Sequence, residues 1–176
     1  RPMNAQAGDL LKVSDFVKHD TVDGKWEVGT AAYDKRGVEA FVPVWNPDNC
    51  IQCNKCSFVC PHACIRPFVM DDKEAAGFDG KTVDILAPKA LKGMKFRIET
   101  SVLDCLGCGN CADVCPGKKN KETGELEKAL KMVPFNVDAP DMKKEAENWE
   151  YLVKNVKSKQ DLVDIKQSPK NSQFAQ

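Results

Sequence analysis

The sequence predicts an α+β domain made of two related halves, for three reasons. A run of four cysteines occurs twice, extended segments rich in β-branched and aromatic residues flank both copies, and a polar stretch with several glycines separates them. A strand, a cysteine loop, a short helix and a strand therefore follow one another twice. We expect two pseudo-symmetric halves with an insertion between them, an N-terminal extension and a C-terminal helix.

The two cysteine runs have the spacing of an iron–sulfur protein. Both read C-x2-C-x2-C-x3-C-P, from Cys50 to Pro61 and from Cys105 to Pro116. Bacterial ferredoxins bind [4Fe–4S] clusters with this spacing, because each iron of the cubane takes a soft thiolate ligand. The predicted fold is thus a bacterial dicluster ferredoxin-like domain with two [4Fe–4S] clusters. Its eight predicted ligands are Cys50, Cys53, Cys56, Cys60, Cys105, Cys108, Cys111 and Cys115.

The spacing also predicts which cysteines share a cluster. In two-cluster ferredoxins the fourth cysteine of each run ligates the cluster of the other run. The first cluster is then bound by Cys50, Cys53, Cys56 and Cys115, and the second by Cys105, Cys108, Cys111 and Cys60. This crossing brings the clusters close together and fastens the two halves to each other. Gly107 and Gly109 are expected to allow close backbone approach to the second cluster.

Other interpretations of these residues are weaker. Structural zinc also takes four cysteines, but generally from two C-x2-C pairs far apart in the chain, without the third and fourth cysteine and the proline found here. The ninth cysteine, Cys64, is either a spare ligand or, as we expect, a small buried residue. His62 either tunes a cluster by hydrogen bonding or, as we expect, is a partly exposed turn residue.

The elements before and around the first loop follow from local patterns. Spaced apolar residues predict a helix of about two turns over residues 10–17, and Asp23-Gly24 predicts a turn. A β-branched and aromatic segment predicts a strand over residues 38–45, with Pro43 at a sheet edge.

The second half is predicted in the same way. A strand over residues 65–70 leaves the first loop, and residues 71–93 form a polar insertion. Strands over residues 95–102 and 129–135 enter and close the second half. Residues 141–156 predict an amphipathic helix that docks on the ferredoxin core or on a neighbouring domain, with Met142, Ala146, Trp149, Leu152, Val153 and Val156 near one face.

Composition excludes several classes of function. The 26 lysines and arginines balance 26 acidic residues, so no basic field favours nucleic acid, and no apolar run is long enough to cross a membrane. The sequence has no nucleophile–base arrangement, phosphate loop or paired carboxylates, so no catalytic residue is predicted and the expected chemistry is one-electron transfer. Reduced, metal-binding cysteines favour the cytoplasm of an organism, such as an anaerobe, that tolerates oxygen-labile clusters.

The flanks of the cysteine runs resemble pyruvate:ferredoxin (flavodoxin) oxidoreductase. The resemblance rests on the Tyr33-Asp34-Lys35-Arg36-Gly37 turn, on Val42-Pro43-Val44-Trp45 and on the Asn148-Trp149 pair in the C-terminal helix, as well as on the cysteine runs. It covers roughly residues 25–176. Family members have glutamate where this chain has Asp34, and often alanine where it has Cys64.

The resemblance implies an electron-transfer domain of a larger, homodimeric enzyme. That enzyme oxidatively decarboxylates pyruvate with coenzyme A to acetyl-CoA, and passes the electrons to an external ferredoxin or flavodoxin. Thiamine diphosphate, Mg²⁺ and a third [4Fe–4S] cluster would then lie in domains outside this chain, which alone is not catalytically complete. No nucleic acid or membrane partner is implied.

We expect the chain to be a piece of a longer polypeptide, since it begins Arg1-Pro2 and ends in a polar, linker-like tail. The predicted parts are a linker-like segment at 1–42, the ferredoxin-like domain at 43–136, and a helix with linker at 137–176. The alternatives are a freestanding carrier with two [4Fe–4S] clusters, a ferredoxin-like subunit of another 2-oxoacid oxidoreductase, and a purely structural cluster module.

Overall fold

The computed structural model describes residues 2, 5–25, 28–29, 34–86, 89–120, 122–164 and 166. The chain divides into two compact units, Arg1–Lys35 and Arg36–Gln176, and each is described by itself. The predicted functional boundaries at 42/43 and 136/137 remain a proposal. No helix in the described ranges is long and apolar enough to span a membrane.

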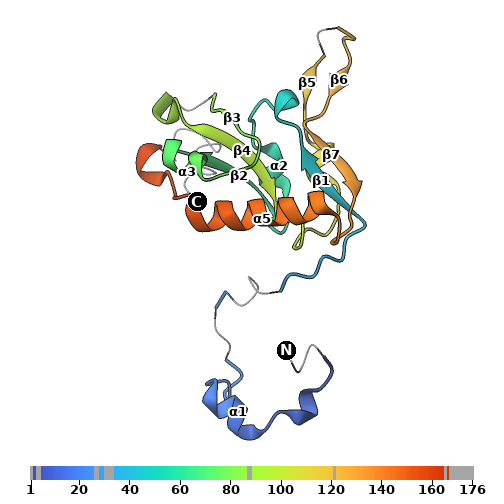
Figure 1. Ribbon diagram of the computed structural model, residues 1–176, viewed down its shortest axis with the longest axis vertical. Coiled ribbons are helices and arrows are strands. Elements are labelled where there is room, and N and C mark those ends of the chain that lie inside the picture. Colours follow the sequence, from blue (N-terminus) through green and yellow to red (C-terminus); the bar gives the residue numbers. More distant parts are fainter. Residues whose placement is uncertain are drawn as a thin grey trace. The chain divides into compact units, whose positions relative to one another are not determined.

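The first unit is built from short helices (Figure 1). A 3-10 helix, η1 (Gly8–Leu10), precedes α1 (Val13–Lys18), so the helix predicted over 10–17 begins later than expected. It begins where the Asp15 carboxylate accepts a hydrogen bond from the Lys12 backbone N–H, at 2.9 Å. The turn predicted at Asp23-Gly24 is present, and Gly24 has a φ of +74°. Of the Tyr33–Gly37 turn, Tyr33 lies outside the described residues.

The second unit pairs strands from opposite halves of the chain. The strand before the first cysteine loop pairs antiparallel with the last strand, and the strand after that loop pairs antiparallel with the strand before the second loop. This confirms a mixed α+β domain, whereas its pseudo-twofold symmetry stays a prediction. The sheets are β1–β7 and β2–β4–β3, with β1 at Phe41–Trp45, β2 at Ile65–Met70, β3 at Val83–Asp84, β4 at Lys95–Thr100 and β7 at Leu130–Pro134.

Residues 71–93 do more than join the two halves. They form α3 (Asp72–Ala76), which a capping box at Asp71 begins, then β3, and then the 3-10 helix η4 (Lys89–Leu91). Ile85 and Leu91 are buried in the main core cluster. The segment is therefore part of the domain's core rather than a loop on its surface.

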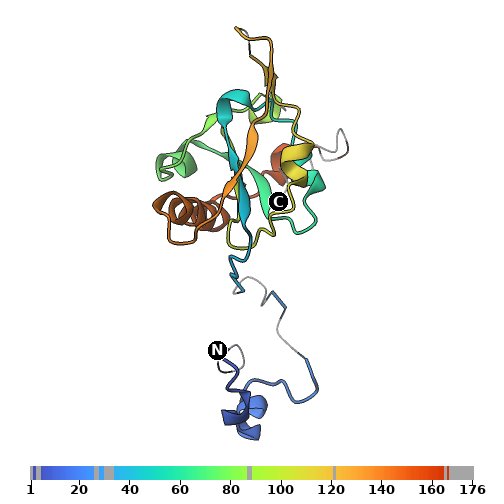
Figure 2. The same cartoon turned by 90° about the vertical axis from the view of Figure 1, so that its right-hand side faces the viewer.

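A second feature that the sequence pattern did not predict is a two-stranded hairpin. Strands β5 (Lys118–Lys119) and β6 (Leu126–Glu127) pair antiparallel and extend away from the sheets (Figure 2). Two-residue strands have too little alternation to be recognised in a charged segment.

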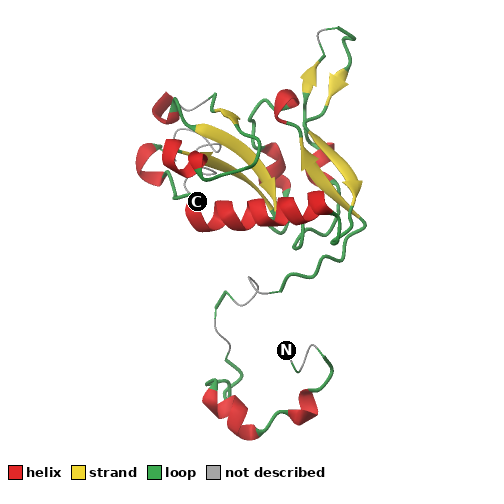
Figure 3. Cartoon of the chain, in the orientation of Figure 1, coloured by secondary structure: helices red, strands yellow, loops and turns green. Residues whose placement is uncertain are grey.

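Helix α5 (Pro140–Asn155) lies along the three-stranded sheet (Figure 3). Of the two docking sites left open by the sequence, the structure shows the ferredoxin core: Met142, Trp149 and Leu152 are buried, and the Trp149 ring packs edge-on against Phe68 at 5.7 Å. Val153, predicted on the apolar face, is instead 52% exposed. The buried face is therefore narrower than predicted, although it reaches both sheets, since Met142 packs with Val42 of β1 and Val133 of β7.

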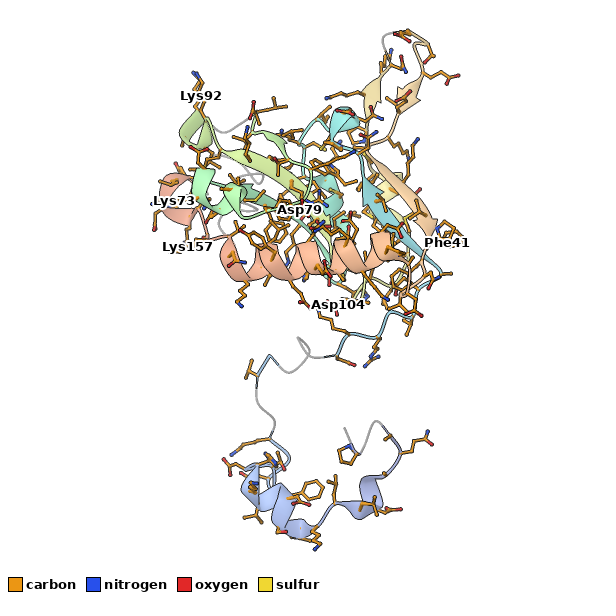
Figure 4. All side chains as sticks on the ribbon, in the orientation of Figure 1. Phe41, Lys73, Asp79, Lys92, Asp104 and Lys157 are labelled. Atoms are coloured by element: carbon orange, nitrogen blue, oxygen red, sulfur yellow. The ribbon has the colours of Figure 1, made fainter. Side chains whose placement is uncertain are left out.

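Ion pairs tie the insertion and helix α5 to strand β4. The Asp79 carboxylate lies 2.6 Å from Lys144 Nζ (Figure 4). At the centre, Arg97 of β4 donates to Glu99 at 2.6 Å and to Glu145 of α5 at 3.0 Å. The pKa of Glu99 is raised to about 9, because burial disfavours its charged form and a hydrogen bond joins it to Glu145. The Arg97 cation lowers this pKa, but offsets the rise only in part.

This network predicts that stability falls as the pH rises. An unfolded glutamate ionises near pH 4.5, whereas Glu99 keeps its proton up to about pH 9. The protonated form therefore contributes stability that is fully present below about pH 4.5 and is lost as the pH rises through about 9. The loss follows one proton and is on the order of 1 kcal/mol per pH unit between these two values. The apparent thermal midpoint of the cluster-loaded protein should fall between pH 6 and pH 9, and should fall less in Glu99→Gln. Glu150→Gln on the exposed face of α5 is the control, and an equal fall in the Glu99 variant would contradict the prediction.

Candidate iron–sulfur cluster sites

The first cysteine loop runs from the 3-10 helix η3 (Pro47–Asn49) into α2 (Lys55–Val59). Two of its residues, Gln52 and Asn54, have positive φ angles of 55° and 59°. Gln52 is 2% exposed, and its amide donates to the Asp84 carbonyl at 2.7 Å and accepts from the Leu86 backbone N–H at 2.8 Å. The insertion thus holds the first loop in place through one side chain.

The second loop has the same backbone turns at the equivalent positions. Gly107 and Gly109 have φ angles of 65° and 80°, and α4 (Asn110–Asp113) follows. A Cβ atom on Gly107 would lie 2.7 Å from the Phe41 carbonyl oxygen, so glycine lets the loop approach strand β1 closely, whereas its approach to the second cluster stays a prediction. At Gly109 no atom lies within 4 Å of that position. Its glycine is favoured by the positive φ angle, not by crowding.

A cavity lies beside the second loop. It is partly open, and its empty volume of about 390 Å³ includes solvent space at the mouth. Three cysteines of the second run line it, and Cys60, the fourth cysteine of the first run, lines it with them. The cysteines that line the cavity are Cys60, Cys64, Cys105, Cys108 and Cys111.

Electrostatic coupling between thiols agrees with this grouping at Cys111 and Cys50, whereas Cys56 is coupled both to Cys50 and Cys53 and to Cys111 of the other run. The pKa of Cys111 is raised to about 11, mainly by burial, and negative charge on Cys105, Cys60 and Cys108 contributes to the rise. In the first site, burial raises the pKa of Cys50, and charge on Cys53 and Cys115 acts in the same direction.

Thiols this crowded ionise only when cations compensate their charge, as iron does in a cluster. The structure therefore brings the predicted ligands together in two groups, and the assignment of ligands to clusters remains a proposal.

In the ranges that the structure describes, no three His, Cys, Asp or Glu side chains converge closely enough to hold one metal ion. A cubane is larger than one ion, so its four thiolates stand further apart. Backbone N–H groups face the sulfurs: Gln52 N lies 3.4 Å from Cys50 Sγ, and Gly107 N lies 3.4 Å from Cys105 Sγ.

Cys64 and His62 are placed beside the second site. Cys64 is 5% exposed, and its thiol donates to the Asp104 carbonyl at 3.1 Å, which supports a packing role. Burial raises its pKa to about 12, so the thiol stays protonated. His62 is exposed in the turn after Pro61, as expected.

Comparison with known proteins now gives the family. A family model described as a 4Fe-4S dicluster domain matches residues 49–119, and another, EKR, described as a domain of unknown function, matches residues 1–39. The chain is 52% identical to the pyruvate:ferredoxin oxidoreductase of Moorella thermoacetica over 137 residues. This alignment covers 77% of the chain and 11% of the relative. The chain is homologous to a segment of pyruvate:ferredoxin (flavodoxin) oxidoreductases.

Two further relatives agree. The pyruvate-flavodoxin oxidoreductase of Enterobacter agglomerans is 44% identical over 156 residues, 86% of the chain and 12% of the relative. The mitochondrial pyruvate dehydrogenase [NADP(+)] of Euglena gracilis is 39% identical over 176 residues, 100% of the chain and 9% of the relative. The chain thus spans about a tenth of the length of the curated relatives it matches.

The matched segment carries the EKR region and the ferredoxin-like dicluster domain of these oxidoreductases, an electron-transfer module. Its eight run cysteines imply two [4Fe–4S] clusters.

Proposed function

We propose that the chain is the electron-transfer domain of a pyruvate:ferredoxin oxidoreductase and relays electrons through two clusters. Each cluster takes its fourth cysteine from the other cysteine run. The first cluster is held by Cys50, Cys53, Cys56 and Cys115, and the second by Cys105, Cys108, Cys111 and Cys60. The observation that carries the proposal is the cavity that Cys60 lines together with the three cysteines of the other run. Neighbouring clusters allow an electron to pass from one to the other within the domain.

The remaining parts of the reaction belong to the rest of the parent enzyme. Thiamine diphosphate with Mg²⁺ and a third [4Fe–4S] cluster in other domains would oxidise pyruvate with coenzyme A, and the two clusters here would deliver the electrons to ferredoxin or flavodoxin. The parent is a cytoplasmic homodimer in this proposal. The residue groups 1–42, 43–136 and 137–176 would be a linker-like segment, the relay domain and a helix leading to the next domain.

The direct test uses the parent enzyme that contains this segment. Anaerobic addition of pyruvate and coenzyme A should reduce both clusters of the segment, seen as two overlapping EPR signals, and oxidised flavodoxin should reoxidise them. Potentials near about −400 mV are expected, as in other low-potential ferredoxins. Clusters that accept no electrons at low potential would support a purely structural role instead.

A second experiment separates the relay from a freestanding carrier. A parent enzyme with Cys105→Ser and Cys108→Ser should still decarboxylate pyruvate once, but should pass few electrons to flavodoxin. Unchanged flavodoxin reduction would overturn the relay proposal. Restoration by added, cluster-loaded wild-type chain would favour the carrier.

A further inference from the structure

The two cysteine loops have similar backbones but differ in one buried side chain. Asn54 occupies the position in the first loop that Gly109 occupies in the second, and both have positive φ angles. Asn54 is 1% exposed, and neither its amide nitrogen nor its amide oxygen has a hydrogen-bond partner among the described residues. It precedes α2 without capping that helix through its side chain.

A buried amide without partners is costly, and native proteins rarely retain one without a reason. Asn54 lies between the ligands Cys53 and Cys56, in the loop that wraps the first site. Thiolate and sulfide sulfurs are the acceptors that a cluster would bring there. Its N–H₂ group is therefore placed to donate to the first cluster.

Trp45 supplies a second buried donor at the same site. Its indole nitrogen is buried without a hydrogen-bond partner among the described residues, and Trp45 packs with Cys50 against the same core cluster. The ring is held by Phe96, edge-on at 6.3 Å, and by the Arg97 guanidinium, 5.7 Å from its centre. The orientation of the indole N–H is thus fixed by its neighbours.

We propose that Asn54 and Trp45 donate N–H hydrogen bonds to sulfur atoms of the first cluster and hold its reduction potential above that of the second. The inference rests on the proposed crossed ligation. Reduction adds negative charge to a cluster, so a donor at its sulfurs stabilises the reduced form more than the oxidised form. The first cluster would then keep an electron in preference to the second, which gives the relay a direction.

The test is an EPR-monitored redox titration of the full chain loaded with both clusters. Asn54→Gly removes the donor, and the positive φ angle that Gly109 already adopts suits glycine. Losing a hydrogen bond to a charged acceptor is expected to shift the reduced-to-oxidised ratio of the first cluster about tenfold. That equals about 59 mV for a one-electron couple. The upper midpoint should fall by this amount and the lower should stay, and Trp45→Phe should act in the same direction.

Gln52→Gly is the matched contrast. It also removes a buried amide at a positive φ angle, but one whose hydrogen bonds go to Asp84 and Leu86. It should lower the thermal midpoint, because it frees the first loop from the insertion, and should shift the midpoint of the first cluster by less than Asn54→Gly does. An equal redox shift in Gln52→Gly would mean that loop distortion causes the effect, and would overturn the inference.

The reverse variant moves the donor to the other loop. Gly109→Asn has open space for its side chain, and asparagine tolerates the positive φ angle. The lower midpoint potential should rise. The reduced-to-oxidised ratio of the second cluster should change by less than tenfold, because this position is more exposed. Unchanged midpoints in both Asn54→Gly and Gly109→Asn would overturn the inference. Two reversible reductions in the same samples would leave the relay itself intact.

Discussion

Replacing Cys60 with serine is expected to destroy the second cluster and to leave the first in place. Cys60 belongs to the first cysteine run, yet it lines the same cavity as Cys105, Cys108 and Cys111. The first cluster should keep its four thiolates, because its fourth ligand is Cys115. Iron content should fall from roughly eight to roughly four atoms per chain. The remaining EPR signal should lack the broadening that two neighbouring reduced clusters cause in each other.

Two variants control this experiment. Cys115→Ser should give the complementary loss, with the first cluster missing and the second retained. Cys64→Ser changes another cysteine that lines the same cavity, but its thiol donates to the Asp104 carbonyl, and a serine hydroxyl can do the same. That variant should keep both clusters. Loss of the first cluster alone in Cys60→Ser would contradict the crossed ligation.

The cluster sites were the most predictable part of the molecule, because ligand spacing is a local property of the sequence. Strand β2 occupies the predicted residues 65–70, since a short apolar run between a turn and an acidic helix start leaves little choice. Helix α5 lies within one residue of the prediction at each end, and the Pro at its first turn explains the start.

The features that the sequence did not predict depend on contacts between distant segments. Residues 71–93 look like a polar loop, but β3 pairs with β4, and Gln52 fixes the segment to the first loop. The Val83-Asp84 pair alone does not indicate that strand β4 will have a free edge with which it can pair. Asn54 is different, because alignment of the two cysteine runs sets it against Gly109. That asymmetry is a property of the sequence, whereas the burial that gives it meaning depends on the fold.

The buried cation Arg97 is expected to carry one of the largest single contributions to the stability of the domain. Its residue is 5% exposed, and its guanidinium reaches Glu99, Glu145 and the Lys81 carbonyl at 2.6, 3.0 and 2.9 Å. It also lies over the rings of Trp45 and Phe78. The Arg97 side chain therefore joins strand β4 to helix α5, to the insertion and to the indole of Trp45.

Arg97→Met keeps an unbranched side chain as far as about the position of Nε, and removes the charge and the five donors. Removing the cation of this buried network leaves the negative charge of the Glu99–Glu145 pair, in which Glu99 is protonated, without compensation and costs about 3–5 kcal/mol. For a protein of this size, that corresponds to a thermal midpoint lower by roughly 10 °C. Thermal unfolding of the loaded chain, followed by circular dichroism and by the visible absorbance of the clusters, measures both losses.

Lys95→Met is the matched control, because Lys95 lies on the same strand and pairs with Asp84 at 2.6 Å, with the two side chains 40% and 78% exposed. An exposed pair of this kind contributes about 0–1 kcal/mol. Arg97→Lys should fall between the two, since lysine keeps the charge but not the planar fork that reaches two carboxylates at once. If Arg97→Met costs no more stability than Lys95→Met, the network does not join helix α5 to the sheet in the way its hydrogen bonds indicate.

The same guanidinium also holds the Trp45 ring. In Arg97→Met the first cluster should therefore be lost at a lower temperature than the second, and this order separates a local effect on the site from a general loss of stability.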